Sequence, residues 1–156
     1  MNQHDFQLTP IDPQTADVLR AKGGPTYVAD ANPGYPCRQC LQDAQVGEVL
    51  VLVSHDPFEH DSPYRSASPI FLHRDSCVAF EGGTAMPAQL TLRQLSVRAF
   101  DDAEMMNDAA VIDGDELAST IIRFFADPQT HHVHVHNATR GCWAVRADRP
   151  ALAAAM

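Results

Sequence analysis

A run of five apolar residues at positions 49–53, Val-Leu-Val-Leu-Val, is the strongest strand signal in the chain. No polar residue interrupts the run, which is typical of a central strand covered on both faces of its sheet. Shorter β-branched or alternating segments predict further strands at residues 26–28, 70–73, 95–100, 132–137 and 142–145. The last two flank the turn-rich segment 137–141, so together they predict a β-hairpin.

Helical spacing of apolar residues is clearest after position 116. Four apolar residues recur there at i, i+4, i+7 and i+8 and predict one buried stripe on an amphipathic helix: Leu117, Ile121, Phe124 and Phe125. Asp127-Pro128 ends this helix, because proline disfavours a helical residue before it. The segment Asp113-Gly114-Asp115-Glu116 predicts a capping box, in which Asp113 accepts from the backbone amide of Glu116.

Two shorter helical segments complete the pattern. Asp12 followed by Pro13 is typical of a helix start, and Gly23-Gly24 ends the helix predicted within residues 10–22. Residues 87–94 predict a helical turn. Strands outnumber helices, so we expect an α+β fold with a mostly antiparallel or mixed sheet, two or three helices and long ordered loops.

The chain shows no repeat, low-complexity tract or Gly/Ser linker, which predicts a single domain over residues 1–156. Residues 55–69 are rich in Pro, Asp and Ser, and a loop of this length is often functional. A domain of 156 residues buries enough surface to fold without a metal or a disulfide.

Charge and composition exclude several classes of function. The 20 acidic and 11 basic residues give a net charge of −9, and no Lys/Arg-rich run is present, so a nucleic-acid partner is not expected. No apolar run approaches the roughly 18 residues that a membrane span needs. The first ten residues do not resemble a secretory leader, which predicts a cytoplasmic protein whose four cysteines are reduced.

Three histidines alternate with valines at residues 132–136, so they share one face of the predicted strand. Neighbouring imidazoles at this spacing can reach one metal ion, which makes His134 and His136 candidate ligands for zinc or another divalent metal. The favoured interpretation is simpler: His132, His134 and His136 form the solvent-facing half of an amphipathic strand. A metal is therefore possible but not favoured, and the cofactor stays unknown.

Cys37 and Cys40 have the C-x2-C spacing of a zinc half-site, and His73 with Cys77 supplies a second candidate pair. A second C-x2-C motif is missing. Two ordinary loop thiols are the simpler interpretation, and a redox motif is disfavoured because no βαβ pattern surrounds it.

The predicted hairpin also brings His136 near Cys142, which suggests a thiolate nucleophile activated by a histidine base. The favoured interpretation is that Cys142 fills the core, as free cysteines often do. Arg38 and Arg65 each lie in a loop close to a tyrosine and are candidates for binding a small anion. The favoured interpretation for both arginines is ion pairing with the surplus acids, for which Asp43 and Glu48 are candidates.

Five short motifs resemble those of a bacterial family catalogued as domain of unknown function 1203: residues 36–38 (Pro-Cys-Arg), 43–44 (Asp-Ala), 47–48 (Gly-Glu), 63–65 (Pro-Tyr-Arg) and 136–142 (His-Asn-Ala-x-x-Gly-Cys). The resemblance covers most of the chain and implies a compact domain with no established activity. Cys40 and His132 lie outside these motifs. The resemblance gives weight to six site residues: Arg38, Tyr64, Arg65, His136, Asn137 and Cys142.

Three functions remain open on this sequence. The best supported is a binding or catalytic site for a small, possibly anionic ligand, with Arg38, Tyr64, Arg65 and Asn137 binding it and His136 and Cys142 as catalytic candidates. The second is a metal-binding protein or metal-dependent enzyme that uses His134 and His136. The third is an interaction module without pocket chemistry. The oligomeric state is not indicated.

Overall fold

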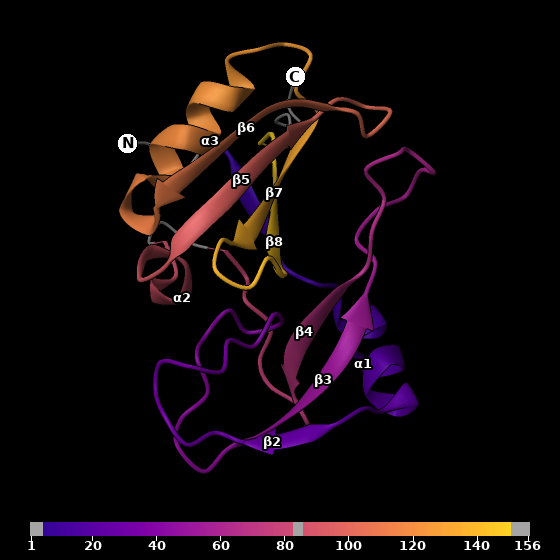
Figure 1. Ribbon diagram of the computed structural model, residues 1–156, viewed down its shortest axis with the longest axis vertical. Helices are drawn as coiled ribbons and strands as arrows, with labels where there is room; N and C mark the ends of the chain where they lie inside the picture. The colour runs from indigo at the N-terminus through magenta and orange to yellow at the C-terminus, as the bar shows by residue number, and fades with distance from the viewer. Residues whose placement is uncertain (1–4, 83–85, 151–156) are drawn as a thin grey trace, which may run out of the picture.

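The computed structural model describes residues 5–82 and 86–150, which form an α+β fold with two antiparallel sheets (Figure 1). The larger sheet has the strand order β1-β8-β7-β5-β6. Its strands are β1 (Gln7–Thr9), β5 (Gln94–Phe100), β6 (Met106–Asp113), β7 (His132–Asn137) and β8 (Trp143–Asp148). The smaller sheet has the order β2-β3-β4, from β2 (Thr26–Val28), β3 (Val49–His55) and β4 (Ser68–His73). The predicted central strand is confirmed, because β3 pairs with a neighbour on each side.

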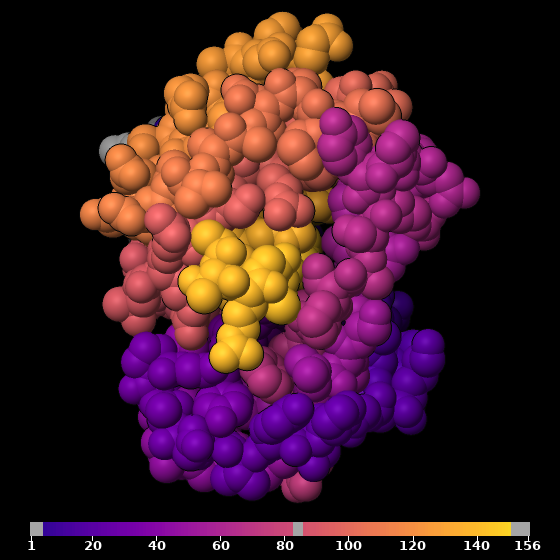
Figure 2. Space-filling model, in the orientation of Figure 1, coloured from indigo at the N-terminus to yellow at the C-terminus, as the bar shows by residue number. Residues whose placement is uncertain are grey.

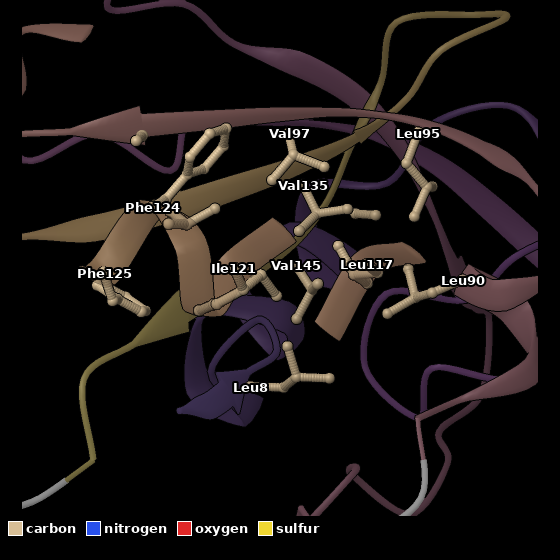
Figure 3. Close-up of a cluster of buried hydrophobic side chains, with 14 of the residues drawn as sticks. Leu8, Leu90, Leu95, Val97, Leu117, Ile121, Phe124, Phe125, Val135 and Val145 are labelled. Atoms are coloured by element: carbon tan, nitrogen blue, oxygen red, sulfur yellow. The ribbon is translucent and has the colours of Figure 1, made fainter. Parts of the chain in front are cut away.

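The helix α3 (Leu117–Phe125) packs on one face of the larger sheet (Figure 3). All four residues of the predicted stripe are buried, which confirms the amphipathic helix. They pack against sheet residues that include Leu95, Val97, Val135 and Val145. The valines of β7 therefore face α3, and period-2 alternation sends its histidines to the opposite face.

The smaller sheet has its own apolar cluster beneath α1 (Pro13–Lys22). As predicted, the Asp12 side chain caps α1 by accepting from the backbone N–H of Thr15 at 3.1 Å, and Gly23 ends the helix with φ of 77°. Trp143 of β8 packs in this cluster, whereas Leu41 packs in the core of the larger sheet. The two cores are thus joined by side chains that cross between the sheets. None of the described helices is long and apolar enough to span a bilayer.

The capping box predicted before α3 is wrong. Asp113 makes no capping hydrogen bond through its side chain, and a 3-10 turn over Gly114–Glu116 leads into the helix instead. The chain comes very close here to α2 (Ala88–Thr91), the predicted helical turn. A Cβ atom at Gly114 would collide with the carbonyl oxygens of Leu90 and Arg93, so this close approach requires glycine.

We expect Gly114→Ala to lower the free energy of unfolding by about 1–3 kcal/mol, the usual cost of overpacking a tight contact. Gly34→Ala is the control, since the nearest atom to its Cβ would be a carbonyl oxygen at an ordinary 3.5 Å. Urea denaturation of both variants measures the difference. Equal free energies of unfolding for the two variants would show that the chain can move away from α2 at Gly114 without loss of stability.

Candidate functional site

A pocket of about 1100 Å³ lies between the smaller sheet and the turn of the β7–β8 hairpin. Figure 2 shows this hairpin, in yellow, next to the indigo segment that contains β2 and the loop after it. Four parts of the chain line the pocket: residues 27–38, the strands β3 and β4, residues 92–94 and residues 137–142. Because distant segments converge here, the pocket is the natural candidate for a binding site.

Arg38 is the most unusual residue of the pocket. Only 2% of it is exposed, yet no carboxylate in the described part of the chain pairs with it. Its Nε donates to the Trp143 carbonyl at 2.8 Å, and its Nη1 donates to the Pro36 carbonyl at 2.6 Å. No described residue accepts from Nη2. Burial lowers the pKa of Arg38 to about 10, so the guanidinium remains charged at neutral pH.

The acids that could have paired with Arg38 are engaged elsewhere. Asp43 forms a two-pronged ion pair with Arg93, at 2.6 and 2.9 Å. Glu48 lies 3.0 Å from His73. Ion pairing of Arg38 with either acid is therefore wrong, and its charge is held in place by backbone carbonyls alone.

Other lining residues add positive charge and an aromatic wall. Arg140, at the exposed hairpin turn, forms no ion pair within the described residues. Phe71 packs against two tyrosines, with ring centroids 5.7 Å from Tyr27 and 5.5 Å from Tyr35. Asp30 is the one acid among the described residues that line the pocket, and it accepts from the Tyr35 hydroxyl at 2.9 Å. The lining thus combines arginine donors with aromatic rings.

Asn137 and Cys142 enter the pocket from the two ends of the hairpin turn. The Asn137 N–H donates to the Cys142 carbonyl at 2.9 Å, and Gly141 adopts φ of 80°, which closes the turn. The buried Oδ1 of Asn137 has no donor in the described part of the molecule. The Cys142 Sγ lies 3.9 Å from the Arg140 carbonyl. Cys142 is half-buried and lines the pocket, so the expectation that it fills the core is wrong.

The six residues highlighted by the sequence do not all meet. Arg38, Asn137 and Cys142 line the pocket. His136 lies behind it, where its Nδ1 donates to the Gly141 carbonyl at 2.9 Å, and no hydrogen bond joins it to Cys142 in the described structure. The thiol and imidazole thus lack the contact that a nucleophile and its base require.

Tyr64 and Arg65 belong to a different part of the molecule. Residues 56–67 connect β3 and β4 and reach the larger sheet, where the Tyr64 ring lies 6.1 Å from Phe100. Arg65 pairs with Asp56 at 2.8 Å and with Asp61 at 2.9 Å. The prediction that Arg65 forms ion pairs is therefore confirmed, although its partners are Asp56 and Asp61 and not Asp43 or Glu48.

The expectation of a solvent-facing histidine row is wrong. His132, His134 and His136 are all buried, because β7 is the middle strand of five and the 56–67 loop covers this face. Burial lowers the pKa of His134 to about 2 and that of His136 to about 4, so both imidazoles are neutral. Their nitrogens do not form a group of three possible metal ligands within the described residues.

The structure instead gathers the four residues of the two other metal candidates. Cys37, Cys40, His73 and Cys77 place their ligand atoms within 4.8 Å of one another. Sequence spacing identifies them as two separate pairs, but only the fold brings the pairs together. Two members of this cluster, Cys37 and Cys40, flank Arg38 in the sequence.

The fold and the site define the chain as an α+β protein with a buried arginine in a pocket beside the smaller of its two sheets. The chain belongs to the family of proteins of unknown function called DUF1203, whose family model matches residues 34–149. This confirms the resemblance seen in the sequence motifs. No curated protein and no solved structure matches the chain.

Proposed function

We propose that the pocket between the sheets binds a small organic anion and that Arg38 is its fixed cation. The supporting observation is the burial of Arg38 without an acidic partner. An uncompensated buried charge costs several kcal/mol, whereas an anion in the pocket would supply the missing counter-charge. Free Nη2 hydrogens on a guanidinium suit the oxygens of a carboxylate or phosphate.

The rest of the lining narrows the class of ligand. Arg140 adds a second cation at the rim, and Asn137 offers an amide for a further hydrogen bond. The wall formed by Tyr27, Tyr35 and Phe71 favours a ligand that carries an aromatic or apolar group beside its anionic one. Four free cysteines fit a reducing compartment, so we place this function in the cytoplasm.

Calorimetric titration with benzoate and phenyl phosphate tests the proposal, with benzyl alcohol as the neutral comparison. We expect both anions to bind and the alcohol not to bind. Replacing a charged hydrogen-bond donor costs about 1.5–3 kcal/mol, so Arg38→Gln should weaken anion binding by about 10- to 100-fold.

Two further variants keep this test decisive if Arg38→Gln does not fold. Arg140→Gln removes the rim cation, whose side chain forms no ion pair within the described residues, and should weaken binding by a few-fold, more at low salt. Arg74→Gln is the control, because Arg74 is exposed and, among the described residues, forms an ion pair with its neighbour Asp75 alone. Dissociation constants above about 10 mM for both anions, or equal effects of all variants, would refute the proposal.

A further inference from the structure

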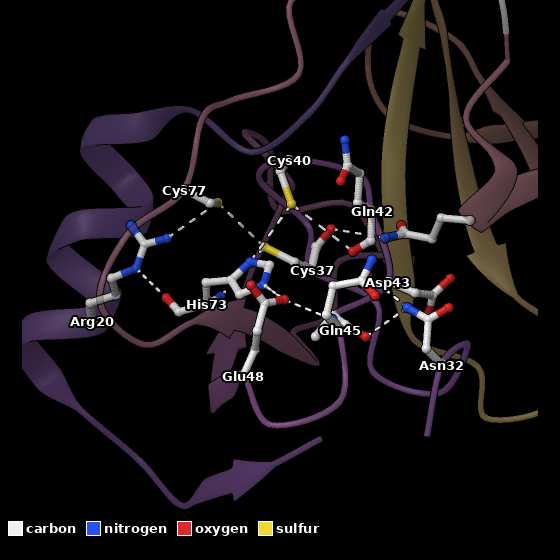
Figure 4. Close-up of polar contacts among 12 residues, drawn as sticks. Arg20, Asn32, Cys37, Cys40, Gln42, Asp43, Gln45, Glu48, His73 and Cys77 are labelled. Carbon is white, nitrogen blue, oxygen red and sulfur yellow. Dashed lines mark hydrogen bonds and ion pairs between the residues drawn. The ribbon is translucent and has the colours of Figure 1, made fainter. Parts of the chain in front are cut away.

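Three cysteines and one histidine converge beside the smaller sheet (Figure 4). Cys37 and Cys40 come from the loop between β2 and β3, His73 is the last residue of β4, and Cys77 follows four residues later. Cys37 Sγ lies 3.7 Å from Cys77 Sγ, and Cys40 Sγ lies 3.7 Å from His73 Nδ1. No disulfide links any of them.

These separations agree with the coordination shell of a tetrahedral zinc ion. Zn–S bonds of about 2.3 Å and Zn–N bonds of about 2.0–2.1 Å place tetrahedral ligand atoms about 3.6–3.8 Å apart. The two separations of 3.7 Å fall within this range. All four ligand atoms lie within 4.8 Å of one another, so the four side chains could coordinate one ion after the more distant ones move closer.

The groups around the cluster are those that support metal ligands. His73 Nε2 lies 3.0 Å from the Glu48 carboxylate, to which it donates, so the Nδ1 lone pair is left for a metal. The His73 backbone N–H donates to Cys37 Sγ at 3.4 Å. Arg20 Nη2 lies 4.0 Å from Cys77 Sγ and places a positive charge beside a thiolate. Three thiolates and Zn²⁺ carry one net negative charge, which this arginine would offset.

Ligand identity and placement indicate the metal and its role. Thiolate and imidazole ligands select zinc over magnesium, calcium or manganese. Four protein ligands leave no open position, which is typical of a structural site. The ligands join two stretches that have no helix or strand, residues 29–48 and 74–82, to the end of β4.

We propose that Cys37, Cys40, His73 and Cys77 bind one zinc ion and that this ion fixes the loops 29–48 and 74–82 to the end of β4. The thiols release their protons to solvent as the ion binds. Arg38 lies within the C-x2-C motif, so the same ion would hold the backbone that presents this arginine to the pocket. The zinc site does not depend on the anion proposal, because zinc can bind whether or not the pocket takes an anion.

The metal content of the full chain, produced in zinc-supplemented medium and purified under reducing conditions, tests the proposal. We expect close to one equivalent of zinc by elemental analysis. After removal of the metal, Co²⁺ should restore one equivalent and give the visible absorption of a tetrahedral thiolate site. Cys40→Ser and Cys77→Ser should lose stoichiometric metal, whereas Cys142→Ser should keep it.

Glu48→Gln keeps the test decisive if the cysteine variants do not fold, because this exposed carboxylate lies outside the ligand set. Replacing this supporting carboxylate with a neutral amide makes the imidazole a poorer ligand and should weaken zinc affinity by about 10- to 100-fold, measured by competition with a chelator. Absence of zinc and of Co²⁺ uptake in the reduced wild type would overturn the proposal. So would iron or copper as the bound ion, a Cys37–Cys77 disulfide in the purified protein, or equal metal loss in Cys142→Ser.

Discussion

Lowering the pH from 7 to 5 should reduce the free energy of unfolding by about 4 kcal/mol, through His134 and His136 alone. In the folded protein burial holds the pKa of His134 at about 2 and that of His136 at about 4. In the unfolded chain both should titrate near 6.5. Between these values the unfolded state binds more protons, so stability falls as the pH falls. Each histidine lowers the free energy of unfolding by about 2 kcal/mol over this interval. This is a large share of the roughly 5–15 kcal/mol by which folded domains are usually stable.

The charges around the two histidines reinforce this direction. His134 faces Arg98, Arg146 and the two neighbouring histidines, and His136 faces Arg98 and Arg38, all of which disfavour an added proton. His136 also donates to the Gly141 carbonyl, which opposes the effect without cancelling it. Burial also lowers the pKa of His132, to about 4. The Glu104 carboxylate, 3.8 Å from its Nε2, would stabilise the protonated imidazole, so the loss of about 4 kcal/mol is assigned to His134 and His136 only.

His134→Phe isolates the contribution of one histidine. Its ring centroid lies 4.9 Å from those of Phe58 and Phe100, and neither of its nitrogens has a hydrogen-bond partner among the described residues. A phenylalanine would remove two unpaired polar atoms and one proton-binding group. We expect the variant to be at least as stable at pH 7 and to lose about 2 kcal/mol less on acidification to pH 5.

Denaturation at a series of pH values measures this difference, with His60→Gln as the control because His60 is exposed. Any effect of acid on the proposed zinc site would be shared by all of these proteins and so cancels in the comparison. An unchanged pH dependence in His134→Phe would show that His134 is protonated without cost in the fold.

Most of the fold was predictable because its elements carry strong local patterns. The Val-Leu run predicts that β3 is a strand covered on both faces. The apolar stripe predicts that α3 is a helix and which of its faces is buried. The edge strands β1 and β6 carry no such pattern. Most of β6 is exposed, its first five residues contain no β-branched residue, and only Val111 and Ile112 near its end suggest a strand.

The site was less predictable, because it depends on contacts between segments that are far apart in sequence. The C-x2-C motif and the His73/Cys77 pair were both visible, but their meeting depends on β4 lying beside the Cys37 loop. Likewise, the three histidines of β7 are buried because β7 is the middle strand of the larger sheet and the 56–67 loop covers their face. Alternation identifies which residues share a face of a strand, but it does not show whether solvent or protein covers that face.

Phe124→Ala should lower the free energy of unfolding by about 3–5 kcal/mol, because it removes a large ring from the core between α3 and the larger sheet. Phe124 is 1% exposed and belongs to the same cluster as Val97, Val135 and Ile121, so no solvent or flexible loop can fill the space that it leaves. Val18→Ala in α1 is the control, since Val18 is 62% exposed and surface changes of this kind stay within about 0.5 kcal/mol. Chemical denaturation of the two variants measures the contrast. A loss below about 1 kcal/mol in Phe124→Ala would mean that α3 does not pack on the sheet through this residue, and that the face opposite the histidines is held by other contacts.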